Sequence, residues 1–184
     1  LTTDWTLQSR GPGSEMELSL EFFELDQDGA RISLGAGVQY SSVNEIIGGD
    51  AEDRLIADYG SFVDVKVTEN AGQRVLTLFD AGDTTNGVDL VKFESLKANE
   101  DATDAGYNTL DMSELGGNLT VNISERLVTG FAFVEGFQGI KTGGGEDQVY
   151  MTGDTRFVET GSSDDVIVLA RTDRDATLEA GSGS

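Results

Sequence analysis

The chain has 184 residues, 38% of them hydrophobic, which is enough for one domain or two small ones with a packed core. Lys and Arg number 12 against 34 Asp and Glu, so the formal net charge is −22, which excludes a nucleic-acid surface and disfavours anionic membranes. Histidine and cysteine are both absent, which excludes Cys/His zinc sites, disulfides and Ser–His or Cys–His catalytic pairs.

The first part of the chain alternates apolar and polar residues with period two. Residues 16–25 and 32–40 alternate in this way around a turn at residues 26–29, and they predict a β-hairpin. A second hairpin is predicted to pair residues 63–67 with residues 75–79 around Asn70, Ala71 and Gly72. No stretch of ten residues has a convincing helical period, so the sequence predicts an all-β protein.

The composition changes near residue 46, where glycine and acidic residues begin to recur in clusters. We therefore expect an N-terminal β-hairpin region over residues 1–45 and a repeat region over residues 46–184. Residues 142–150 and 160–168 share Thr, Gly, an acidic residue, Asp and an aliphatic residue at the same places, and 165 − 147 gives an offset of 18. Apolar columns at a constant offset are typical of a solenoid with about 18 residues in each coil. The three predicted columns are Phe131–Val149–Ile167, Phe133–Met151–Leu169 and Ile140–Val158–Ala176.

Three segments resemble the nonapeptide G-G-x-G-x-D-x-U-x, in which U is a large aliphatic residue, of the calcium-binding RTX repeat family. Residues 48–56 have Ala51 at the last glycine position, residues 142–150 have Thr142 at the first, and residues 160–168 have Ser163 at the last. Residues 180–184 resemble the start of another copy, so we expect the chain to be a piece of a longer protein. The resemblance implies a parallel β-roll or β-solenoid with calcium-binding turns, preceded by β-hairpins.

In the family, Ca²⁺ is held between turns by glycine-turn carbonyls and aspartates, which are the oxygen ligands that this ion prefers. The residues that the resemblance implies as metal ligands or turn residues are Gly48, Gly49, Asp53, Gly143, Gly145, Asp147, Gly161, Ser163 and Asp165. The alternative for each aspartate is a cap that hydrogen-bonds the backbone of a glycine turn. Arg156 and Arg174, which are separated by the same offset, stand where aspartates would lie on the opposite side. We therefore expect calcium on one side of the coil only.

The implied function is a calcium-binding, calcium-stabilised structural module of a secreted RTX-type protein, such as an adhesin, surface-layer or accessory segment. It implies type I secretion to the extracellular space or bacterial cell surface, and no catalytic residues, nucleic acid or membrane insertion. Calcium ions are the expected partners, together with a cell-surface glycan or neighbouring repeats. Two alternatives stay open: a carbohydrate-binding β module with exposed aromatic side chains, and a fragment of a β-helix enzyme that modifies polysaccharides.

Overall fold

A computed structural model of the chain confirms the all-β class. It describes residues 5–8, 17–19, 22–26, 29–33, 39–47, 53–57, 62–80, 87–98, 106–169 and 175–183. The described residues contain one short 3₁₀ helix, η1 (Ile123–Glu125), and no helix that is long and apolar enough to cross a membrane.

The strands fall into three sheets, and most pairings between the described strands are parallel. The strands of the 11-stranded sheet are β19 (Thr177–Ser182), β17 (Phe157–Ser162), β15 (Gly139–Lys141), β11 (Thr109–Asp111), β7 (Val63–Asn70), β8 (Gln73–Asp80), β9 (Val88–Val91), β5 (Gln39–Ile47), β4 (Gly29–Ser33) and β3 (Phe22–Asp26), with β1 (Trp5–Gln8) paired to β5. One four-stranded sheet contains β14 (Phe133–Glu135), β10 (Ser95–Ala98), β6 (Arg54–Ala57) and β2 (Glu17–Ser19). The other contains β13 (Leu127–Val128), β12 (Thr120–Asn122), β16 (Gln148–Met151) and β18 (Val166–Leu169).

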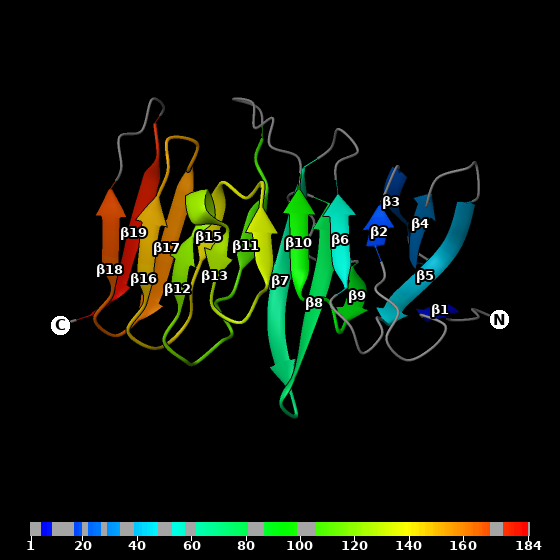
Figure 1. Ribbon diagram of the computed structural model, residues 1–184, viewed down its shortest axis with the longest axis horizontal. Helices are drawn as coiled ribbons and strands as arrows, with labels where there is room; N and C mark the ends of the chain where they lie inside the picture. The colour runs from blue at the N-terminus through cyan, green and yellow to red at the C-terminus, as the bar shows by residue number, and fades with distance from the viewer. Residues whose placement is uncertain are drawn as a thin grey trace.

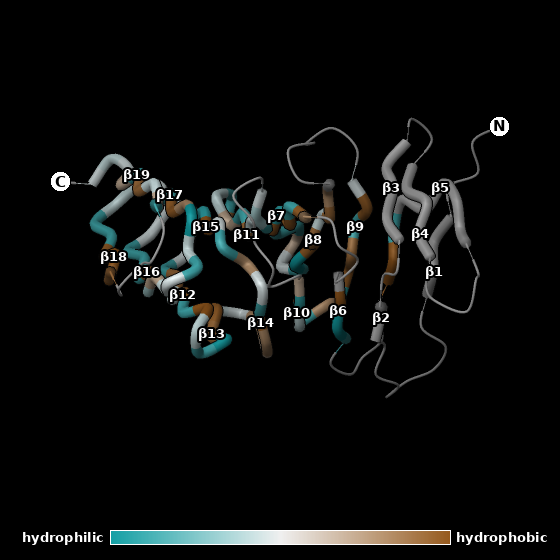
Figure 2. The backbone as a smooth tube through the Cα atoms, turned by 90° about the horizontal axis from the view of Figure 1, so that it is seen from above, coloured by the Kyte–Doolittle hydropathy of each residue, from teal (hydrophilic) through white to brown (hydrophobic). Residues whose placement is uncertain are grey.

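The sheets lie in two layers along the long axis of the molecule (Figures 1 and 2). The 11-stranded sheet forms one layer, and the two four-stranded sheets follow one another in the second. From β15 onward the chain alternates between the layers: β15, β17 and β19 lie in the first, and β16 and β18 in the second. Successive passages of the chain therefore stack side by side.

The second predicted hairpin is confirmed, and the first is confirmed in part. β7 and β8 pair antiparallel from Val63 opposite Asp80 to Asn70 opposite Gln73, and this long hairpin extends below its neighbours in Figure 1. Ala71 and Gly72 form its tip with φ of 52° and 79°, as a tight two-residue turn requires. In the first hairpin, β3 pairs with β4 from Phe22 opposite Ser33 to Asp26 opposite Gly29.

Each stretch predicted as one side of the first hairpin contains parts of two strands: residues 32–40 include the end of β4 and the start of β5, and residues 16–25 include β2 and most of β3. β2 and β3 lie in this stretch but belong to different sheets, since β2 pairs with β6 and β3 with β4. Period two is preserved in both pieces, so the pattern cannot reveal that the chain changes sheet. The predicted boundary near residue 46 falls within β5, and it stays a prediction.

The register of the parallel strands tests the predicted columns. Val149 pairs with Ile167, Met151 with Leu169 and Ile140 with Val158, which confirms the predicted repeat step between these strands. The outer members of the columns are wrong: Val121 takes the place of Phe131, Phe133 pairs with Ser95, and Leu178 takes the place of Ala176. The insertion of η1 and β13 displaces the two phenylalanines, and the last passage is slightly longer than the sequence offset suggests.

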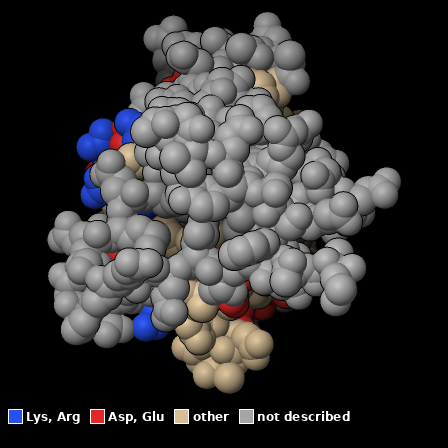
Figure 3. All heavy atoms as spheres, turned by 90° about the vertical axis from the view of Figure 1, so that its right-hand side faces the viewer, with Lys and Arg blue, Asp and Glu red and all other residues tan. Residues whose placement is uncertain are grey.

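The inward-facing residues form a continuous hydrophobic core that runs from Ile46 to Val158. Rows such as Leu55–Leu96–Val134 and Val65–Leu110–Ile140 are almost completely buried. Burial ends at β18 and β19, where Leu169 is 63% exposed and Leu178 is 41% exposed. Seen from the right-hand side of Figure 1, the described Lys and Arg side chains that are visible gather mainly along one flank (Figure 3).

Candidate metal site

Three glycines stack at the turns that lead from the first layer to the second. Gly144 forms a β-bridge with Ser162, and Ser162 in turn pairs with Ser182, so Gly143, Gly161 and Gly181 follow one another across three passages of the chain. A Cβ on Gly161 would collide with the carbonyl oxygen of Gly143, and one on Gly181 would collide with that of Gly161. Glycine is therefore required here because each turn presses its backbone against the previous one.

The second turn position adopts a backbone conformation that favours glycine. Gly145 has φ of 113°, and Ser163, at the same place in the next repeat, has φ of 98°. Ser163 therefore keeps the glycine conformation of the repeat although it carries a Cβ, which strains the backbone. The structure thus places Gly143, Gly145, Gly161 and Ser163 together, as predicted.

Asp147 and Asp165 stack on one another directly after these turns. We call the four residues Thr142, Asp147, Thr160 and Asp165 the acidic corner. Asp147 Oδ1 accepts a hydrogen bond from the backbone N–H of Leu119 at 2.8 Å. Asp165 Oδ1 accepts one from the N–H of Asp147 at 3.0 Å. The expected contact between aspartate and backbone therefore exists, but each carboxylate bonds to the preceding passage of the chain and not to its own turn.

The acidic corner contains buried oxygen atoms that no described donor satisfies. Asp147 has no exposed surface, and Thr142 and Thr160 are each 1% exposed. Asp147 Oδ2 and the hydroxyls of Thr142 and Thr160 have no hydrogen-bond partner among the described residues. Buried polar groups in proteins are nearly always satisfied, and these three oxygens are of the kind that a cation or a water molecule can satisfy.

Electrostatics at Asp147 lead to the same conclusion. Burial raises the pKa of its carboxyl, and the neighbouring charge of Asp165 raises it further. The Thr142 hydroxyl, which lies near the carboxyl without the geometry of a hydrogen bond, and the Leu119 N–H lower this pKa only in part. Ionisation of Asp147 is therefore less favourable in the folded protein than in water, and a nearby cation would favour it.

Asp53 lies apart from the acidic corner, at the start of β6. It is completely buried, and its N–H donates to Glu94 Oε2 at 2.9 Å while its carbonyl accepts from the N–H groups of Glu94 and Ser95. Glu94 thus stacks on Asp53 much as Asp165 stacks on Asp147. Gly48 and Gly49, predicted with Asp53, lie outside the described residues.

The opposite turns carry neutral amides, and we call Asn108 and Gln138 the amide corner. Asn108 Oδ1 accepts from the Val63 N–H at 2.9 Å, and its Nδ2 donates to Gly136 O at 2.8 Å. Gln138 Oε1 accepts from the Asn108 N–H at 3.1 Å. Arg156 continues this stack, since its N–H donates to Gln138 O at 2.8 Å. Arg156 therefore lies on the opposite side from Asp147, as predicted, and Arg174 lies outside the described residues.

The sequence pattern missed several residues of both corners. Thr142 and Thr160 were visible as residues at the same place in two repeats, but Thr142 was interpreted only as a substitution for glycine and Thr160 was given no role. Asn118, whose Oδ1 accepts from the Glu146 N–H at 2.9 Å, is displaced by the insertion of η1 and β13. Glu94 is separated from Asp53 by the whole β7–β8 hairpin. Insertions in the repeat hid these neighbours, so no constant spacing could reveal them.

The donor set fits a hard cation such as Ca²⁺, which takes carboxylate, hydroxyl and carbonyl oxygens. No group of three or more carboxylates that could hold a metal forms among the described residues. An ion here would therefore take Asp147, Asp165 and backbone or hydroxyl oxygens of the glycine turns. Comparison with family models, with curated proteins and with solved structures found no match. The interpretation of the acidic corner thus depends on its own chemistry.

Proposed function

We propose that the chain is a calcium-binding, calcium-stabilised structural module of a secreted RTX-type protein. One observation carries the proposal: the carboxylate of Asp147 is fully buried, lies beside a stack of glycine turns, and keeps one oxygen without a described donor. A buried anion without a counter-charge is costly, whereas an oxygen-liganded cation would stabilise it.

A β-solenoid is the architecture that best accounts for the described pairings. The chain alternates between two layers after β15, and its last passages repeat with nearly the same step, since Val149 pairs with Ile167 and Val158 with Leu178. Each passage buries its apolar row against the next, as in quasi-one-dimensional repeat proteins. The RTX resemblance of residues 142–150 and 160–168 supports this proposal, because both segments form turns of the same kind.

Calcium would act as a structural ion that joins successive turns. Asp147 Oδ2 and Asp165 would supply carboxylate oxygens, and the glycine-turn backbone would supply carbonyls. The ion would remove the repulsion between the two carboxylates, which lie one strand apart. Metal-binding free energy in such a site adds directly to the free energy of folding.

This arrangement suits a protein that folds after export. At low calcium, the net charge of −22 opposes compaction of the chain. Outside the cell, calcium exceeds the dissociation constants of ~10⁻⁴–10⁻³ M that are typical of extracellular modules, so the turns would close. We propose no catalytic residue, and the module would serve as an adhesin, surface-layer or accessory segment.

The experiment is a comparison of thermal unfolding and circular dichroism in chelator, in calcium and in magnesium. At ~100 times its dissociation constant, calcium stabilises the folded state by about 2.7 kcal/mol, which raises the melting temperature by several degrees. Magnesium should have little effect because it demands octahedral geometry and gives up its water ligands reluctantly. Identical melting curves in calcium and in chelator would show that the metal does not stabilise this fold.

A further inference from the structure

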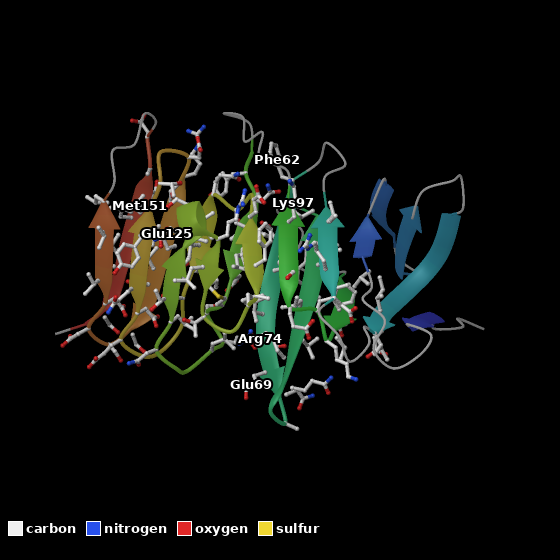
Figure 4. All side chains as sticks on the ribbon, in the orientation of Figure 1. Phe62, Glu69, Arg74, Lys97, Glu125 and Met151 are labelled. Carbon is white, nitrogen blue, oxygen red and sulfur yellow. The ribbon has the colours of Figure 1, made fainter. Side chains whose placement is uncertain are left out.

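A second concave site lies away from the acidic corner, and residues of η1 form part of its lining. Glu125, labelled in Figure 4, is the last residue of this 3₁₀ helix. The groove has a volume of about 250 Å³. The lining residues that matter for its chemistry are Ile123, Ser124, Arg126, Glu135, Gln138 and Asp154.

Gln138 is a lining residue of the groove, and its side-chain amide can offer a hydrogen-bond donor. Gln138 is 3% exposed, and its Oε1 already accepts from the Asn108 N–H. No described residue accepts a hydrogen bond from its Nε2. This nitrogen is not among the buried polar atoms that lack a partner, so it can donate to water or to a ligand that enters the groove.

Arg126 forms one wall of the groove, and its backbone is held in a strained conformation. Its φ is 60°, in the left-handed region, and its N–H donates to Ile123 O at 3.1 Å. The guanidinium bonds to Glu135 Oε1 at 3.1 Å and lies over the Phe133 ring, 5.3 Å from the centroid. The left-handed conformation is that of the C-cap of η1, and the side chain, 55% exposed, presents the guanidinium at the groove wall.

The mixture of polar groups decides the class of ligand. Arg126 and Gln138 offer N–H donors, Glu135 and Asp154 offer acceptors, and Ser124 offers a hydroxyl that does both. The side-chain charges are one positive and two negative, so an anionic ligand is disfavoured. Alcohol hydroxyls suit such a mixture because each can donate and accept at once, and Ile123 provides an apolar contact.

From the amide donor of Gln138, the guanidinium of Arg126 and this charge balance, we infer that the groove binds a neutral polyhydroxylated ligand, namely one sugar residue. Binding requires concave shape with a few fixed polar groups, which these residues supply. The site is independent of calcium at the acidic corner, because it shares no side chain with it.

The test is titration of the isotope-labelled chain in calcium with glucose, galactose, mannose, N-acetylglucosamine and glucuronate, followed by amide NMR. At least one neutral sugar should shift the signals of Ser124, Arg126 and the Gln138 side chain with saturation. Glucuronate should bind at least about tenfold more weakly. A β-linked disaccharide of the binding sugar distinguishes a glycan end from a free monosaccharide.

Two variants separate binding from folding. Arg126→Asn removes the ion pair with Glu135 but suits the positive φ, which Asn tolerates. The melting temperature should therefore change by no more than a few degrees, whereas sugar binding should weaken at least about tenfold. Gln138→Glu retains the acceptor for Asn108 and removes the donor, so it should also weaken binding. Arg74→Gln, at another arginine stacked on an aromatic ring, is the control and should bind like the wild type. No saturable shift with any neutral sugar, tighter binding of glucuronate, or unchanged binding by Arg126→Asn would overturn the inference.

Discussion

The acidic corner and the amide corner solve the same structural problem with different side chains. Both hold successive passages of the chain together through a buried polar side chain that bonds to the neighbouring backbone. At the amide corner, Asn108 offers a donor and an acceptor, and both are used. At the acidic corner, Asp147 offers only acceptors, and one of them has no described donor.

Because of this difference, only the acidic corner depends on a further partner for its buried side chain. The Asn108 amide satisfies both of its neighbours without help, so these contacts of the amide corner need no ion. A carboxylate needs a proton, a water or a cation for its second oxygen. We therefore expect the amide corner to stabilise the fold under all conditions and the acidic corner to stabilise it only with calcium.

The largest loss of stability is expected from a substitution at the amide corner. Asn108→Ala would leave the Val63 N–H and the Gly136 carbonyl without their partner inside the core, at a cost of about 3 kcal/mol in the free energy of unfolding. Urea denaturation in calcium and in chelator should show the same loss. Asn122→Ala, which removes a cap of η1, is the control and should cost about 1 kcal/mol. A loss at Asn108 that appeared only in calcium would contradict the division between the corners.

The next effect concerns the pH dependence of the acidic corner in chelator. The raised pKa of Asp147 means that the folded state holds this proton more tightly than the unfolded state. Its contribution to stability is therefore greatest at low pH and falls as pH rises from about 3.9, the ordinary value, through the raised folded pKa.

Asp147→Asn tests this directly, because the amide keeps an acceptor for Leu119 and adds a donor. In chelator at neutral pH the variant should be more stable than the wild type by about 1 kcal/mol, the typical net contribution of a hydrogen bond. The stability difference between the two should shrink toward low pH. Parallel stability curves for the two proteins across this range would show that Asp147 is not strained when ionised.

The smallest change in stability is expected at the turn that contains Ser163, whose φ is positive. Ser163→Gly should stabilise the protein by up to about 1 kcal/mol, because φ of 98° suits glycine better than serine. Ser162→Gly, in the neighbouring position of β17, should instead destabilise by about 0.5 kcal/mol, since glycine weakens a strand. Thermal unfolding of both variants checks the contrast. Equal shifts of the same sign would mean that the positive φ of Ser163 carries no strain.

The sequence could predict the parts of this fold in which the repeat is uninterrupted. Thr142 and Thr160, or Val149 and Ile167, follow at the constant offset of the repeat because no insertion separates them, and both their stacking and their turns were predictable. The predicted places of Phe131 and Phe133 in the columns are wrong because η1 and β13 interrupt the repeat. Asn108 and Gln138 differ by 30 in residue number, which matches no repeat length, so only the structure reveals the amide corner.

The predicted ligands divide in the same way. Asp147 and Asp165 were placed together because their spacing equals one passage of the chain. Asp53 was identified by the same nonapeptide pattern, but its neighbour Glu94 follows a long hairpin and has no counterpart in the repeat. Period and motif therefore identify a repeating turn, whereas the partner across an insertion depends on tertiary packing.

The most direct test of the central claim is a calcium titration of the wild type, Asp147→Asn, Asp165→Asn, the double variant and Arg156→Ala. If one ion joins Asp147 and Asp165, each single variant should weaken calcium binding at least about tenfold, and the double variant should lose little more. Arg156→Ala, on the opposite side, should bind calcium like the wild type. Independent effects of the two aspartates, together with an equal loss in Arg156→Ala, would contradict a shared calcium site at the acidic corner.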